Sequence, residues 1–101
     1  MIDPQEWGAA VAPYLDLLDT ARGRRLSAAE LERGFLDLYQ DDETLWPDEL
    51  YEPLERFFGY AEDYVDDPQL WAEAGGTDPA TLVAQAEVLS TRLAELMSGA
   101  A

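Results

Sequence analysis

The 101-residue sequence contains no cysteine, no histidine and no lysine. Without cysteine, the chain cannot form disulfides, cysteine-ligated zinc sites or thiol nucleophiles. Without histidine and lysine, it lacks the commonest general base, the commonest metal ligand and the amine that forms Schiff bases. We therefore expect a protein that is not an enzyme and that has neither a cofactor nor a metal site.

Positive charge and long apolar runs are scarce as well. Six arginines stand against 22 acidic residues, which gives a formal net charge of −16. This charge repels nucleic acid and anionic membranes, so we expect a basic protein as the partner; the alternative is that the charge serves solubility alone. No segment approaches the ~20 apolar residues of a membrane span. The first residues carry acids and a proline instead of a secretory signal, so a cytoplasmic protein is expected.

Helix-opening signals recur along the chain. Asp3-Pro4 and Asp78-Pro79 each place a capping oxygen before a proline that suits the first helical turn. The motif "SAAE", which begins at Ser27, is a capping box. Together with the step "WPDE", these signals predict helices that begin near Pro4, Ala28, Pro47 and Pro79.

Two other prolines fall inside the helical patterns. Pro13 should either kink the first helix or mark its true beginning, because proline removes a hydrogen bond and clashes with the preceding turn. If Pro53 breaks the third helix in the same way, that helix opens near Glu52 instead of at Pro47.

Apolar residues make up 48% of the chain and recur at steps of three and four in each predicted helix. No segment alternates between apolar and polar residues in the manner of a strand. We therefore predict an all-α protein, a small antiparallel four-helix bundle. It should be a single domain, residues 1–101, with the last few residues as a flexible tail. The expected shared core is Leu18, Phe35, Leu38, Leu54, Phe57, Ala61, Leu89 and Leu93.

The segment 38–67 contains eleven carboxylates and a single arginine among aromatic side chains. Asp41–Glu52 has the length of a calcium loop, but its fifth, sixth and seventh residues are leucine, tryptophan and proline, where ligands and a glycine turn are needed. Paired carboxylates hydrolyse glycosides only in a concave site, for which a thin bundle has little room. On the third helix, Asp48, Glu52 and Glu55 instead project from one side. The segment thus predicts a folded acidic surface that meets a basic partner.

The motifs also occur in a particular order: "RLSAAELERGFLDLYQDD", then "LWPDELYEPLERFFGYAEDYVDDPQL", then a leucine-rich final helix. In its Ser-led helix with a Phe-x-x-Leu-Tyr end, its acidic loop and its Trp-Pro-Asp-Glu step, the chain resembles the bacterial self-protective colicin-like immunity family. The colicin D immunity protein is the best-known type of that family. The resemblance covers roughly Leu15 to Leu96. It implies a small helical bundle that blocks a nuclease toxin, in the best-known case one that cuts tRNA, by covering the active site.

This implication fits the charge of the chain. A ribonuclease cleft holds phosphates with cationic side chains, and a rigid array of carboxylates can occupy the same positions. We therefore expect an immunity protein, a monomer before it binds its toxin, that inhibits a cognate basic nuclease toxin domain. Its expected toxin-binding residues are acids, with two aromatic anchors at the start of the third helix: Asp41, Asp42, Glu43, Trp46, Asp48, Glu49, Tyr51, Glu52 and Glu55.

Two other functions stay open. An acidic DNA mimic would inhibit a DNA-binding protein or a restriction enzyme, but its charges would have to follow phosphate intervals along an extended surface, and here they gather in one patch. A plain structural bundle would carry its charge for solubility. The position of Trp46 is open too, because a tryptophan at a helix start suits the core as well as an interface.

Overall fold

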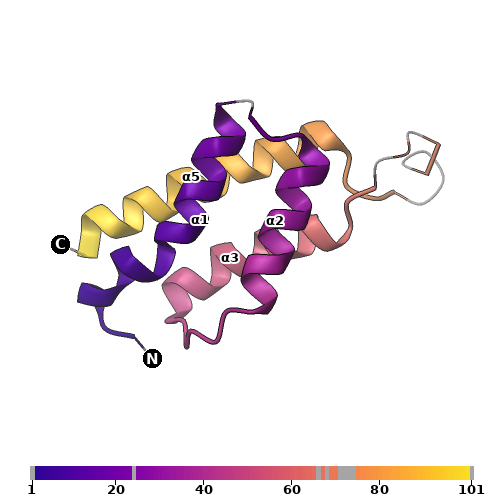
Figure 1. Ribbon diagram of the computed structural model, residues 1–101. Helices are drawn as coiled ribbons and strands as arrows, with labels where there is room; N and C mark the ends of the chain where they lie inside the picture. The colour runs from indigo at the N-terminus through magenta and orange to yellow at the C-terminus, as the bar shows by residue number, and fades with distance from the viewer. Residues whose placement is uncertain (1, 24, 66, 68, 71–74, 101) are drawn as a thin grey trace.

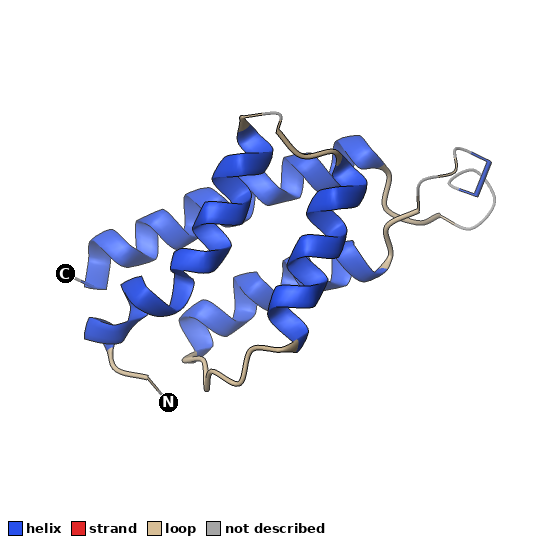
Figure 2. Cartoon of the chain, in the orientation of Figure 1, coloured by secondary structure: helices blue, strands red, loops and turns tan. Residues whose placement is uncertain are grey.

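The computed structural model describes residues 2–23, 25–65, 67, 69–70 and 75–100. Within these residues the prediction of an all-α fold is confirmed, because the chain forms helices and no strand (Figure 2). The helices are η1 (Pro4–Glu6), α1 (Trp7–Arg22), α2 (Ala28–Gln40), α3 (Asp48–Glu62) and α5 (Pro79–Ala100).

The predicted helix starts are confirmed, and local hydrogen bonds explain two of them. Before α2, the Glu30 N–H donates to Ser27 Oγ (3.1 Å) and the Ser27 N–H donates to Glu30 Oε1 (2.9 Å). Before α5, the Thr81 N–H donates to Asp78 Oδ1 (2.7 Å). These bonds satisfy backbone N–H groups that have no partner inside a helix.

Both internal prolines lie inside helices. Pro13 is within α1, so it does not mark the beginning of that helix. Pro53 is buried within α3, which begins at Asp48 and not near Glu52. Each proline costs one helical hydrogen bond. Burial of Pro53 against the rest of the molecule offsets that loss.

A single cluster of buried side chains joins the helices. Seven of the eight residues predicted for the core are buried in it, and the eighth, Leu38, lies partly exposed at its edge. Aromatic rings form its centre, where Phe35 and Phe57 meet edge to face with centroids 4.7 Å apart. The cluster consists of Trp7, Val11, Tyr14, Leu18, Leu31, Phe35, Leu50, Leu54, Phe57, Ala61, Leu82, Ala86, Leu89 and Leu93.

Figure 1 shows how the helices are arranged around this core. α1 and α2 lie side by side in front, with α3 and α5 behind them. α5 packs against each of α1, α2 and α3. The radius of gyration, 13.9 Å, is close to the roughly 13 Å of a compact 100-residue domain. No helix in the described part combines the length and the apolarity needed to cross a membrane.

Both chain termini lie at the end of the molecule where α3 begins (Figure 1). The chain start is tied to the α2–α3 loop, because the Ile2 N–H donates to the Leu45 carbonyl (3.2 Å). The predicted toxin-binding residues from Asp41 to Trp46 therefore lie on a loop that joins two helices and is braced by the N-terminal segment, and the remaining ones lie on α3.

Candidate functional site

The structure brings the predicted binding residues together on the α2–α3 loop and the first two turns of α3. We call this surface the acidic face, and it consists of Asp41, Asp42, Glu43, Trp46, Asp48, Glu49, Tyr51, Glu52 and Glu55. Backbone hydrogen bonds fix the loop where it leaves α2 and where it enters α3. The N–H of Asp41, the C-cap of α2, donates to the Asp37 carbonyl (3.4 Å), and the extended Pro47 accepts the first hydrogen bonds of α3.

Asp42 is half-buried and held inside this surface. Its Oδ2 accepts a hydrogen bond from the Tyr14 hydroxyl (2.6 Å), and its Oδ1 accepts one from the Thr44 N–H (2.8 Å). Burial alone would raise the pKa of the Asp42 carboxyl, but the hydrogen bonds from Thr44 and Tyr14 outweigh it and lower that pKa. Asp42 therefore stays ionised at neutral pH and fixes the loop to α1.

Two carboxylates of α3 also have partners in the chain. Glu55 Oε2 accepts a hydrogen bond from the Tyr39 hydroxyl (2.8 Å), which ties α3 to α2. Glu52 forms an exposed ion pair with Arg56 one turn later in the same helix. A charge that already has a partner must exchange it to bind a second protein, so these two acids are less available than their exposure suggests.

Four carboxylates of the acidic face are exposed and make no side-chain hydrogen bond or ion pair to the described residues. These are Asp41, Glu43, Asp48 and Glu49. Two apolar side chains lie exposed among them, Leu45 with 70% of its surface in solvent and Tyr51 with 47%. Leu45 was not among the residues predicted from the sequence, although a leucine within so acidic a segment is unusual enough to draw attention. Exposed apolar and aromatic side chains beside charged ones are common at protein-binding surfaces.

The Trp46 side chain packs against the core beneath this surface. It is half-buried and meets the Tyr14 ring edge to face, with centroids 5.9 Å apart. Tyr39 stacks on Phe35 at 5.4 Å and contacts Phe58 at 5.2 Å. A layer of aromatic rings thus supports the acidic face from below, and such layers resist deformation because their rings have few rotatable bonds.

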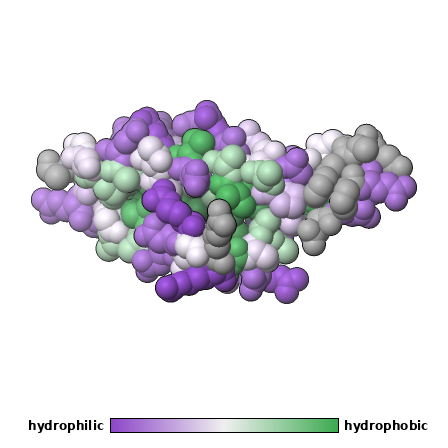
Figure 3. All heavy atoms as spheres, turned by 90° about the horizontal axis from the view of Figure 1, so that it is seen from above, coloured by the Kyte–Doolittle hydropathy of each residue, from purple (hydrophilic) through white to green (hydrophobic). Residues whose placement is uncertain are grey.

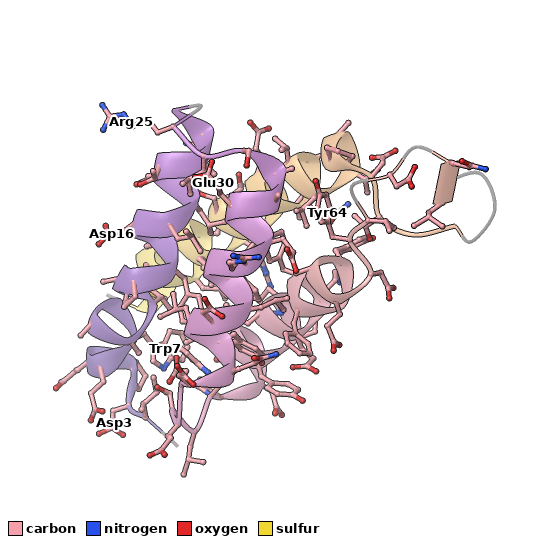
Figure 4. All side chains as sticks on the ribbon, turned by 45° about the vertical axis from the view of Figure 1, so that its right-hand side comes forward. Asp3, Trp7, Asp16, Arg25, Glu30 and Tyr64 are labelled. Atoms are coloured by element: carbon pink, nitrogen blue, oxygen red, sulfur yellow. The ribbon has the colours of Figure 1, made fainter. Side chains whose placement is uncertain are left out.

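Figure 3 shows hydrophilic residues around a few apolar ones on the face that is seen from above. Acids outside the acidic face are exposed as well. Asp16, for example, points outward from α1 (Figure 4). Among the described residues, no three acidic side chains converge closely enough to hold a metal ion. Comparison of the chain with protein-family models, with curated proteins and with solved structures gave no match.

Proposed function

We propose that this chain is an immunity protein, which inhibits a cognate tRNase-like nuclease toxin by covering its basic active site with the acidic face. The observation that carries this proposal is the set of exposed carboxylates without partners around Leu45 and Tyr51. The resemblance to the colicin-like immunity family, drawn from the motif order, points to the same function.

The chemistry of a nuclease cleft supports the proposal. Cationic side chains that bind phosphate also bind carboxylates, with short charge-assisted hydrogen bonds that are often bidentate to arginine. The net charge of −16 attracts such a cleft over a distance and raises the association rate. The hydrogen bonds of Tyr14 and Tyr39 hold the surface in one shape, which lowers the entropy cost of binding.

Under this proposal the protein acts by occlusion and not by catalysis, needs no cofactor, and works in the cytoplasm as a monomer until it meets its toxin. The four helices form an antiparallel bundle whose task is to present the acidic face as a rigid body. Inhibition then requires only that the bundle stays folded while it is bound.

The test is to search the neighbouring reading frames for a basic nuclease-like domain and to co-express the chain with it. The unaltered protein should protect cells, and a variant with four amides should not: Asp41→Asn, Glu43→Gln, Asp48→Asn and Glu49→Gln. Removal of one partner of a desolvated charge pair costs about 2–5 kcal/mol, so binding should weaken at least about a hundredfold. Helical circular dichroism should stay unchanged, because all four side chains are exposed.

A matched control removes four other exposed acids that lie away from the α2–α3 loop: Asp16→Asn, Asp19→Asn, Glu62→Gln and Glu87→Gln. It has the same net charge as the first variant, but its acids lie on α1, at the end of α3 and on α5. Asp16, for example, points outward from α1 (Figure 4). This control should still protect cells, with a slower and less salt-sensitive association. If the control lost protection and the first variant kept it, the acidic face would not be the binding surface.

A further inference from the structure

A groove of about 620 Å³ lies between α1 and α2, beside the acidic face. Its lining combines small or apolar side chains with carboxylates. The apolar part consists of Ala9, Ala10, Pro13, Gly34 and Leu38, and the polar part of Asp37, Asp41, Asp42 and Thr44. The groove therefore shares Asp41 and Asp42 with the acidic face.

Small residues create this groove where two helices meet. At Gly34 the helices approach so closely that a Cβ atom there would lie 3.0 Å from Leu17 Cδ1. Alanines on the α1 side leave the adjoining space unfilled. Pro13, which lies inside α1, adds an apolar ring to the same side of the groove.

The carboxylates of the groove have no cationic partner among the described residues. Asp37 and Asp41 are exposed and stand four residues apart at the end of α2, where like charges repel each other. Asp42 is half-buried, and the groups that bond to its oxygens, Tyr14 and Thr44, are neutral. A cation in the groove would relieve this repulsion, and the long-range field of the whole chain favours its arrival.

We propose that this groove binds an arginine side chain of the basic partner. The inference rests on the proposed function, and it adds a contact between α1 and α2 to those made by the acidic face. A guanidinium is planar and weakly hydrated, so it can lie against the alanines and Pro13 while its N–H donors reach the carboxylates. Lysine fits less well, because its compact, strongly hydrated ammonium gains little from the apolar floor.

The direct test needs no toxin. N-acetyl-arginine amide is titrated into the full chain and followed by amide-resolved NMR, with N-acetyl-citrulline amide as the neutral probe of the same shape. The arginine probe should shift the amide signals of Ala9, Ala10, Gly34 and Asp37 in a saturable way, and the citrulline probe should not. Equal shifts with both probes, or arginine-induced shifts spread over all acidic residues, would overturn the proposal.

Two double variants separate the groove from the general negative field. Asp37→Asn with Asp41→Asn removes two charges from the groove, whereas Asp48→Asn with Glu49→Gln removes two charges from the start of α3. The first pair should weaken binding of the arginine probe about tenfold, because charge-assisted hydrogen bonds become neutral ones. The second pair should weaken it less than about twofold at moderate salt. Equal losses for the two pairs would show that only the net charge attracts the probe.

Failure of this inference can be told from failure of the proposed function. If the protein protects cells from its toxin but the arginine probe leaves the groove signals unchanged, only the groove assignment is wrong. If the probe binds in the groove but no neighbouring nuclease is inhibited, the groove stands as a guanidinium site and the proposed function is wrong.

Discussion

The acidic face and α5 are built in opposite ways. Residues 41–55 contain seven acids and no arginine, whereas the 22 residues of α5 contain two acids, one arginine and no aromatic side chain. α5 is held by buried aliphatic residues, with Leu82, Leu89 and Leu93 in the core. The acidic segment, residues 41–55, also contains buried leucines. In addition, it accepts two hydrogen bonds from tyrosines of other helices.

The difference bears on the purpose of the charge. α5 exposes Val83 (43%) and Val88 (52%) on its outer side, where acids could be placed without disturbing the core. A chain that needed negative charge for solubility alone would gain from acids at those positions. Instead, seven acids lie within residues 41–55, where their mutual repulsion opposes folding. The aromatic contacts beneath this segment stabilise it against that repulsion. This concentration favours a binding role for the acidic face over a purely solubilising one.

The largest effect that we predict concerns the support of the acidic face. Phe57 on α3 is 2% exposed and packs edge to face on Phe35, so Phe57→Ala should lower the free energy of unfolding by about 3–5 kcal/mol. The matched control on α5 is Val88→Ala, which should change it by less than about 0.5 kcal/mol. Urea denaturation of both variants measures this contrast. A loss below about 1 kcal/mol for Phe57→Ala would mean that the acidic segment does not depend on its aromatic layer.

An intermediate effect is expected from Tyr14, which bonds to Asp42; the hydrogen bond that α5 receives from another helix, from Arg22 to Ser90 Oγ, is longer at 3.4 Å. Tyr14→Phe should cost about 1.5–3 kcal/mol at neutral pH, the usual worth of a hydrogen bond to a charged group. Burial, and then the hydrogen bond and charge of Asp42, raise the pKa of the Tyr14 hydroxyl far above its ordinary value of 10.0. Its contribution to stability is therefore present below that pH and is lost as the pH rises further, since the unfolded chain can ionise there.

Unfolding measured at a series of alkaline pH values checks this linkage. The unaltered protein should lose stability above about pH 10, and Tyr14→Phe should lose less over the same range. Tyr39, whose pKa is also raised by burial and by Glu55, should account for part of the remaining loss. If the two proteins lost stability in parallel, the Tyr14 hydroxyl would not be confined as the structure describes.

The smallest effects should come from the exposed ion pairs, one in each region. Arg92→Gln on α5 removes the partner of Glu95 and should cost less than about 0.5 kcal/mol. Arg56→Gln on α3 removes the partner of Glu52 in more acidic surroundings, so it should cost a few tenths more. The excess should vanish in about 1 M salt, which screens charges beyond roughly 3 Å. Thermal melts in low and high salt would decide this, and an excess that salt left unchanged would contradict it.

Helix starts and most of the core could be predicted because their causes are local in the chain. The capping box at Ser27 joins residues three apart, and the apolar stripes follow from the helical repeat. The effects of Pro13 and Pro53 could not be predicted, since packing from other helices decides whether a helix tolerates a proline. Leu38 shows the same limit, because its stripe reaches the edge of the core and not the centre.

For the candidate site, sequence alone determined the charge, the absence of histidine, lysine and cysteine, and the gathering of acids with aromatics around the start of the third helix. Only the tertiary structure decided which acids are available to a partner. Asp42 is bound by Tyr14, 28 residues away, and Glu55 by Tyr39, 16 residues away. The groove arises in the same way, between Ala9, Ala10 and Pro13 of α1 and Gly34 and Leu38 of α2. Composition and periodicity carry no information on such distant pairs, because the pairs exist only once the helices pack.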